Sequence, residues 1–385
     1  MLTAEQREIR DLARDFVEGE IVPRAASWDR DGAFEREILD KLAALGFMGM
    51  LVPADYGGLE FDVPTYLVAL EEIARGDAAL ALTVAIQNGP VPHLLLAHGS
   101  EAQRAEWLPA LAAGEKIAAF ALSEADAGSD PAGMHTRARR HGGAWEISGS
   151  KRWVTNGCLA DVAVVFARTG SGELRAPTGA FIVDTGAEGY RVARREKTMG
   201  LRASETVSVE LEDVRVDSTR LVGDPARGLA YALEALDLGR LGIGAQAVGI
   251  AGAALEHATR YARERRQFGR TIASFGAIRS KLAVMATRIA ASRALVREGA
   301  EEWEARASRP GEDLPVTARS AMAKLLASET AMWVTEEAVR IFGGYGFMRE
   351  FPVEKLMRDA KGTEIYEGTS EILRLVIGRA VTGTE

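Results

Sequence analysis

The sequence predicts an α+β fold in three parts: an N-terminal helical domain over residues 1–117, a middle β-barrel or β-sandwich domain over residues 118–225, and a C-terminal four-helix bundle over residues 226–385. The periodicity of apolar residues favours this division. Apolar residues recur every three to four positions near the N-terminus, every second position in the middle, and every three to four positions again after Leu229. A chain of 385 residues also has the length of two or three domains.

Two capping boxes mark helix starts in the N-terminal part. Thr3 precedes Gln6, and Ser100 precedes Gln103, by three residues. At this spacing a hydroxyl and a side-chain amide can each accept a hydrogen bond from the other residue's backbone N–H. Apolar residues at helical spacing follow each box, so we expect helices that pack on a common core.

The middle part has the signature of short, half-buried strands. Apolar and polar residues alternate strictly over residues 207–212, and a Gly142-Gly143 pair separates two strand-like runs and predicts a hairpin turn. Several short strands separated by turn residues predict a small barrel or sandwich.

Long helical stripes return in the C-terminal part. They are interrupted by a charged, Pro- and Gly-containing break over residues 306–315, which is too short for a domain linker. Long helices joined by short breaks predict a helical bundle. The apolar residues expected to form the buried stripes are Ile278, Leu282, Met285, Ile289 and Leu295, then Met322, Leu325, Leu326, Met332, Val339 and Ile341.

Composition excludes several classes of partner. The formal net charge of −8 argues against nucleic acid as the main partner. A single cysteine, Cys158, allows no intramolecular disulfide and predicts a reducing, cytoplasmic location, and with only five histidines we expect no metal site. We see no signal peptide and expect no membrane span; the Ala/Gly-rich residues 242–255 come nearest and are interpreted as a buried helix.

The stretch over residues 364–371 is the strongest candidate for catalysis. Glu367 precedes Gly368, which allows the backbone to bend close to a ligand, and lies beside apolar Ile365 and Tyr366. A carboxyl group in such surroundings can have its pKa raised and act as a general base. The alternative is that Glu364, Glu367 and Glu371 form the solvated acidic face of a helix.

Two further segments combine small, hydroxyl and aromatic residues. Residues 120–130 begin as a strand and open into a loop whose N–H and hydroxyl groups can approach a ligand closely. Residues 151–157 place Trp153 near Thr155, which suits stacking on a ring and hydrogen bonding at its edge. The alternatives are an ordinary turn, a core tryptophan and a strand threonine.

Three more segments carry charged residues or glycines. Asp237 and Arg240 share a helix face and can simply pair with each other. The basic residues 263–266 can form a solvated face, or bind phosphate through arginine. Gly343, Gly344 and Gly346 indicate a helix end or a close backbone approach, but no strand–loop–helix unit surrounds them as a dinucleotide fingerprint requires.

These six segments, in this order, resemble those of the acyl-CoA dehydrogenase family, and the resemblance covers essentially the whole chain. The similarity is greatest to the short-chain, butyryl-CoA-type branch. It implies an FAD-dependent enzyme of fatty-acid β-oxidation that converts a short- to medium-chain acyl-CoA to the trans-2-enoyl-CoA. It also implies electron transfer to an electron-transfer flavoprotein and a homo-oligomer, namely a tetramer built as a dimer of dimers.

The resemblance also assigns roles to individual residues. Glu367 is the implied general base. The implied substrate contacts are Ser129, Asp237, Arg240, Tyr366 and Gly368. The implied FAD contacts are Phe120, Leu122, Ser123, Gly128, Ser129, Trp153, Thr155, Arg265, Gln267, Phe268, Phe275, Gly276, Arg340, Gly343, Gly344, Thr369 and Glu371. The basic cluster that contains Arg265 is expected to reach the FAD of a neighbouring subunit.

Four positions depart from the family pattern. Ala125-Asp126 stands where Pro then Gly is usual, and both Gly276 and Arg340 stand where the family commonly has glutamine. Some branched-chain members carry their catalytic glutamate at the position of Gly239, which has no side chain to serve as a base.

Four alternative functions remain at this stage. They are a branched-chain acyl-CoA dehydrogenase, a flavin oxidase on the same fold, a module that binds acyl-CoA or FAD without turnover, and a purely structural helical protein. Glu367 and the chain length argue against an oxidase, and Glu367 beside the flavin-like segments argues against a binding module. The β segment with its Trp153 and Ser129 loops argues against a purely structural helical protein.

Overall fold

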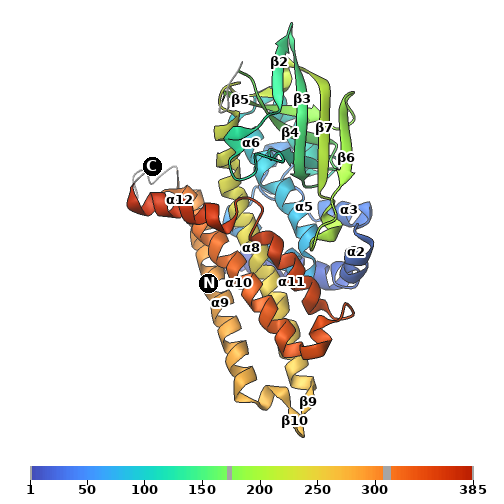
Figure 1. The fold of residues 1–385 in the computed structure, drawn as a ribbon, viewed down its shortest axis with the longest axis vertical. Helices are drawn as coiled ribbons and strands as arrows, with labels where there is room; N and C mark the ends of the chain where they lie inside the picture. The colour runs from blue at the N-terminus through green and yellow to red at the C-terminus, as the bar shows by residue number, and fades with distance from the viewer. Residues whose placement is uncertain (1, 171–175, 307–313, 384–385) are drawn as a thin grey trace.

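The computed structural model describes residues 2–170, 176–306 and 314–383. A helical part is followed by a sheet and then by long helices, as Figure 1 shows, so the α+β prediction is confirmed. Most of the predicted break at 306–315 lies outside the described residues.

The N-terminal part contains seven α-helices among the described residues. Both predicted capping boxes are present: Thr3 pairs with Gln6 at the start of α1, and Ser100 pairs with Gln103 at the start of α7. A single π-helical turn, Val17–Ile21, extends α1. The helices are α1 (Ala4–Phe16), α2 (Ala25–Asp31), α3 (Arg36–Ala44), α4 (Val63–Gly76), α5 (Ala78–Asn88), α6 (Pro90–His98) and α7 (Glu101–Ala112).

The middle part forms one eight-stranded sheet in the described chain, in the order β6-β7-β3-β2-β4-β5-β8, with β1 pairing in parallel with β4. The predicted hairpin is confirmed, because β2 and β3 pair antiparallel across Gly142-Gly143. The strands are β1 (Ala118–Ala121), β2 (Arg137–His141), β3 (Ala144–Val154), β4 (Val162–Arg168), β5 (Thr178–Asp184), β6 (Tyr190–Arg195), β7 (Val207–Asp217) and β8 (Leu221–Val222).

The C-terminal part is built on α8, which runs unbroken for 37 residues. A short hairpin at the end of α8 leads into α9 and lies at the bottom of Figure 1. The elements are α8 (Gly228–Glu264), β9 (Arg266–Gln267), β10 (Arg270–Thr271), α9 (Gly276–Ala305), α10 (Val316–Phe342), α11 (Pro352–Thr363) and α12 (Ser370–Thr382).

The buried face of α10 differs from the predicted stripe. Leu326 is 38% exposed, whereas small residues such as Ala321, Ala327 and Ala331 are buried. Small side chains allow two helix backbones to approach closely, so they displace the larger residues from the contact face. The predicted position of Leu326 in the core was therefore wrong.

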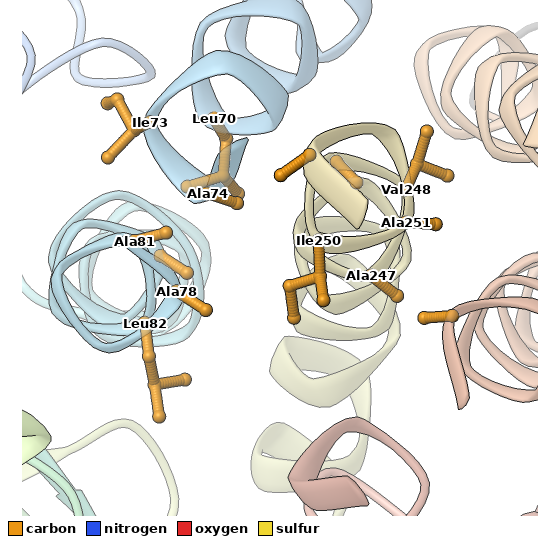
Figure 2. Packing of buried hydrophobic residues seen from close by; sticks show 14 of the residues in the cluster. Leu70, Ile73, Ala74, Ala78, Ala81, Leu82, Ala247, Val248, Ile250 and Ala251 are labelled. Atoms are coloured by element: carbon orange, nitrogen blue, oxygen red, sulfur yellow. The ribbon is translucent and has the colours of Figure 1, made fainter. Parts of the chain in front are cut away.

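One continuous core joins the N-terminal and C-terminal helices. In Figure 2, Ala74 of α4 and Ala78 of α5 point toward α8, and Ile250 lies on the side of α8 that faces them. Gly249 of α8 allows this contact, because a Cβ there would lie 2.3 Å from the backbone oxygen of Glu71. The same packing holds α4 against α8, two helices that are distant in sequence and that both contribute residues near Glu367.

Two helical segments, Ala78–His98 and Gly228–Glu264, are long and apolar enough to span a membrane by length and composition alone. This corrects the expectation that no run reaches that length. In each, 89% of the most apolar window is buried inside the protein, as expected of core helices.

Candidate active site

Glu367 lies in the turn between α11 and α12, not on a helix face. Its φ angle is 54°, in the left-handed region that non-glycine residues seldom adopt, and Gly368 follows at 106°. Thr369 caps α12 by accepting a hydrogen bond from the N–H of Ile372 at 3.3 Å. The alternative of a solvated acidic helix face is therefore wrong for Glu367.

The carboxyl group of Glu367 points into the protein. Its Oε2 atom is fully buried and has no hydrogen-bond partner among the described residues. Burial raises the pKa of Glu367 to about 7, although the positive charges of Arg240 and Lys324 act to lower the same pKa. Gly239 of α8 makes room for it, because a Cβ there would lie 2.3 Å from Oε2.

Two tyrosines stand near this carboxyl group. Tyr66 of α4 is 1% exposed, and Tyr366 donates a hydrogen bond to Oε1 of Gln246 at 2.8 Å. Burial, with a smaller effect of the negative charge of Glu367, raises the pKa of both phenols, so both stay neutral near pH 7. Neither tyrosine therefore adds a charge beside Glu367.

Asp237 and Arg240 pair with each other, and the pair also reaches the turn. Arg240 donates from one terminal nitrogen to Oδ1 of Asp237 at 2.5 Å and from Nε to the backbone oxygen of Glu367 at 3.2 Å. Thr317 donates to Oδ2 of Asp237 at 2.5 Å. Asp237 and Arg240 therefore do pair with each other, as the sequence allowed, and Arg240 also links α8 directly to the Glu367 turn.

The loop after β1 and the end of β3 form a second group of predicted site residues. The N–H of Arg152 donates to the backbone oxygen of Ser123 at 2.9 Å. The ammonium of Lys151 donates to the backbone oxygen of Leu122 at 2.9 Å and to Oε1 of Glu124 at 2.8 Å. Glu124 accepts two further backbone N–H groups, which orders the loop beside Leu122 and Ser123.

Trp153 is exposed rather than buried. The register of β3 against β7 shifts between Lys151 and Val154, and Trp153 has a φ angle of 56°. Bulges of this kind turn a side chain away from its expected direction. The indole is 55% exposed, and a Cβ on Gly128 would lie 3.8 Å from it. The alternative of a core tryptophan is therefore wrong.

The other residues of these two segments differ in exposure. Phe120 packs on Phe166 with ring centroids 4.8 Å apart, and Leu122 is buried. Ser123 and Thr155 are partly exposed, and Ser129 is exposed. Next to Thr155, Asn156 accepts a hydrogen bond from Thr83 of α5 at 2.8 Å, which ties this loop to the helical core.

Arg265, Gln267, Gly343 and Gly344 come together in a hollow of about 450 Å³ at the far end of the bundle. Figure 1 shows this end, marked by β9 and β10, well separated from the turn before α12. Within a single chain, these residues therefore do not meet Glu367.

The aromatic and arginine residues at this end have varied surroundings. Phe268 is 92% exposed, and its ring contacts that of Phe275 edge to face at 6.0 Å. Arg340 pairs with Glu336 and, at 2.6 Å, with Glu337. Gly276 has nothing within 4 Å of an added Cβ, so a side chain could start there without a clash.

Thr369 and Glu371 belong to a fourth place, a hollow of about 320 Å³ that Lys361, Glu364 and Arg374 also line. Glu371 is exposed in the first turn of α12. The predicted residues thus lie in four groups. Tyr366, Gly368 and Arg240 lie next to Glu367, and Asp237 is joined to its turn through Arg240.

Sequence reasoning missed Lys324 and the roles of Lys151 and Tyr66. Lys324 is a lone cation inside an Ala- and Leu-rich helical stretch. This is a usable signal, because lysine is rarely fully buried unless its charge has a partner. Tyr66 gave no signal, since its position depends on how α4 packs against α8.

The comparisons with known proteins agree with the observed fold. The family models for the N-terminal, middle and C-terminal domains of acyl-CoA dehydrogenases match residues 3–115, 119–214 and 226–382. The chain therefore belongs to the acyl-CoA dehydrogenase family, whose members are flavin-dependent oxidoreductases, and the resemblance inferred from the six segments is confirmed.

Individual relatives match along their whole length. An acyl-CoA dehydrogenase of Bacillus subtilis (strain 168) is 40% identical over 99% of both chains. A short-chain specific acyl-CoA dehydrogenase of Megasphaera elsdenii is 39% identical over 99% of this chain and 98% of its own.

Solved structures match equally well. Butyryl-CoA dehydrogenase of Megasphaera elsdenii superposes with a TM-score of 0.94 at 38% identity, over 99% of both chains. A chain from the structure of the electron transferring flavoprotein of Acidaminococcus fermentans has the same score and identity, over 99% of this chain and 98% of that one. A glutaryl-CoA dehydrogenase of Mycobacterium smegmatis in complex with FADH2 scores 0.92 at 32% identity, over 100% of this chain and 96% of that one.

Proposed function

We propose that this protein dehydrogenates a short- to medium-chain acyl-CoA to the trans-2-enoyl-CoA, with Glu367 as the general base. The observation that carries this proposal is the buried, unpartnered Oε2 of Glu367, held in a left-handed turn opposite Gly239. The similarity to a butyryl-CoA dehydrogenase and to short-chain specific relatives supports the choice of chain length.

Glu367 removes a proton from the carbon next to the thioester carbonyl. A general base works best when its pKa lies near the operating pH, and the pKa of Glu367 is raised to about 7. The fixed turn and the pairing of Arg240 with its backbone oxygen hold the carboxylate in place before substrate binds. Tyr366, Gly368, Asp237 and Arg240 are the proposed substrate contacts around it, and Ser129 is the proposed contact to the CoA arm.

The residues present fit an FAD cofactor. Trp153 offers a largely exposed indole beside the loop of Ser123 and Ser129, which suits a planar ring with polar edges. We propose Leu122, Ser123, Trp153 and Thr155 as its ring contacts, and a structure similar to this chain is described in complex with FADH2. Bound FAD would accept the hydrogen that leaves the neighbouring carbon as a hydride.

The far end of the bundle supports a homo-oligomer. Arg265 and Gln267 line a hollow there, while Phe268 is 92% exposed. We propose that this end contacts the FAD of a second copy, with Arg265 at its phosphates, within a tetramer built as a dimer of dimers. The match to a chain of an electron transferring flavoprotein structure supports such a flavoprotein as the electron acceptor.

Gly239 argues against a branched-chain enzyme with its base on α8. A glutamate at this position would place its Cβ 2.3 Å from Oε2 of Glu367, so the two carboxyl side chains cannot both occupy this space. Glu367 therefore remains the proposed base.

Anaerobic titration of the flavin-loaded protein tests the proposal. Butyryl- through palmitoyl-CoA, isobutyryl-CoA and isovaleryl-CoA are added in turn while the flavin absorbance is followed. We expect bleaching by the short- and medium-chain thioesters. Bleaching by the branched pair alone would favour a branched-chain enzyme. Rapid reoxidation of the bleached flavin when air is then admitted would favour an oxidase. No bleaching by any thioester would contradict the proposal.

A further inference from the structure

Lys324 lies in the middle of α10 and is completely buried. Its ammonium donates a hydrogen bond to the backbone oxygen of Gly368 at 2.7 Å. Arg240 holds the preceding backbone oxygen, that of Glu367, at 3.2 Å. Two cations from two different helices therefore hold successive carbonyl groups of the turn that carries the proposed base.

Lys324 differs from Lys151, which is also fully buried, and from Lys355, which is half-buried. Lys151 pairs with Glu124 at 2.8 Å, and Lys355 pairs with Asp77 and Asp359 at 2.8 and 2.6 Å. Lys324 has no such ion pair within the described residues, and its ammonium bonds instead to a neutral carbonyl, that of Gly368. Burying an ammonium with so little compensation costs stability, and a methionine of similar size would pack there without this cost.

The groups that face Glu367 come from three helices and its own turn. Arg240 comes from α8, Lys324 from α10, Tyr66 from α4, and Tyr366 from the turn itself. Both tyrosines are neutral, so the cations alone favour a charged Glu367. Burial lowers the pKa of Lys324 to about 8. The negative charges of Glu367, Glu364 and Glu371 act to raise the same pKa, and the positive charge of Arg240 acts to lower it.

We propose that Lys324 is a positioning residue for the proposed dehydrogenation: its ammonium holds the left-handed turn at Gly368, and its charge keeps Glu367 ready to accept a proton. The inference rests on the proposed function of Glu367. The structure gives Lys324 two separable effects, a hydrogen bond that orders the turn and a charge that favours the carboxylate form.

The two effects can be separated by substitution. Lys324→Met removes the hydrogen bond and the charge, Lys324→Gln removes the charge but retains a donor, and Lys324→Arg retains both. Ser328→Ala serves as the matched control, because Ser328 is fully buried one turn further along α10 and its hydroxyl donates to the backbone oxygen of Leu325.

Infrared difference spectroscopy then follows the protonation of Glu367 with pH in each folded variant, with no substrate present. The carboxyl band is assigned by its loss in Glu367→Gln. We expect Lys324→Met and Lys324→Gln to titrate about one pH unit higher than the wild type, since a nearby cation lowers the pKa of a carboxyl group by this order. Lys324→Arg and Ser328→Ala are expected to titrate as the wild type.

The pH profile of kcat/KM provides the second measurement. We expect the acidic limb of this profile to move to higher pH by about one unit in Lys324→Met and Lys324→Gln. At pH values below the limb, kcat/KM of these variants should then be about tenfold lower than that of the wild type, and at higher pH it should recover. Hydrogen exchange of the 364–371 segment should accelerate in Lys324→Met more than in Lys324→Gln.

An unchanged infrared midpoint in folded Lys324→Gln would overturn the inference. The same conclusion follows if Ser328→Ala shifts the midpoint as much as Lys324→Gln, because the effect would then be a general disturbance of α10. Failure of the wild type to oxidise any acyl-CoA would contradict the proposed function instead, and the infrared titration would still decide whether Lys324 controls Glu367.

Discussion

At the scale of single residues, the ionisation of Glu367 should appear in the stability of the protein. The pKa of Glu367 is raised from 4.5 to about 7 in the folded chain, so the folded state binds this proton more tightly than the unfolded state does. Its contribution to stability is fully present below about pH 4.5, declines as pH rises toward 7 and is lost above that value, by about 3 kcal/mol in total.

Glu367→Gln cannot ionise and should escape this loss. We therefore expect the variant to gain in stability relative to the wild type between about pH 5 and about pH 8, as measured by urea denaturation at both values. Glu5→Gln, on the exposed first turn of α1, is the control and should show no such gain. An equal difference at both pH values would show that burial of the Glu367 carboxyl does not perturb its ionisation.

Gly239 offers a second test at this scale. An alanine there would suit the helix, which favours alanine over glycine by about 1 kcal/mol, but its Cβ would displace the carboxyl group of Glu367. We expect Gly239→Ala to fold normally and to lose at least tenfold in kcat. Gly252→Ala, on the same helix and with nothing within 4 Å of the added Cβ, should keep full activity. Equal activity of the two variants would contradict the close approach of Gly239 to the carboxyl group of Glu367.

At the scale of elements, the contact between α4 and α8 depends on Gly249. A Cβ there would lie 2.3 Å from the backbone oxygen of Glu71, and a backbone atom cannot move aside cheaply. We expect Gly249→Ala to destabilise the protein by about 1–3 kcal/mol, and Gly252→Ala to be neutral or slightly stabilising. Thermal unfolding of both variants measures this, and a Gly249→Ala protein as stable as Gly252→Ala would contradict the packing.

The elements also show what the sequence can predict. The capping boxes at Thr3 and Ser100 and the hairpin at Gly142-Gly143 depend on neighbours within a few residues, so local rules identified them. The buried face of α10 was misjudged at Leu326, because closeness of approach, rather than hydrophobicity, selects small residues there. Lys324 could not be placed at Gly368 either, since 44 residues separate them.

The site shows the same limit. Glu367 was identified as the candidate base from the sequence, through its glycine neighbour and the family resemblance. Its left-handed turn and unpartnered Oε2 depend on α4, α8 and α10, which no local pattern brings together. The outward direction of Trp153 likewise depends on a register shift against β7 that residues 151–157 alone do not reveal.

At the scale of the whole molecule, two parts of the proposed site lie far apart in one chain. Arg265 is at the end marked by β9 and β10, and Glu367 is in the turn before α12 (Figure 1). If a second copy completes each site, two inactive variants can complement each other. We expect co-expressed Glu367→Gln and Arg265→Ala chains to form mixed oligomers with more activity than either variant alone.

The control is the same pair purified separately and mixed without exchange of chains, which should stay inactive. Absence of any recovery in verified mixed oligomers would show that each site is completed within one chain.

The most direct test of the proposed chemistry is anaerobic stopped-flow mixing of butyryl-CoA with the flavin-loaded wild type and with Glu367→Gln. Both proteins should carry flavin, but a neutral amide cannot accept the α-proton. We expect the wild type to bleach rapidly and the variant to bleach more slowly by several orders of magnitude. Bleaching of Glu367→Gln at a rate near that of the wild type would contradict the assignment of Glu367 as the base.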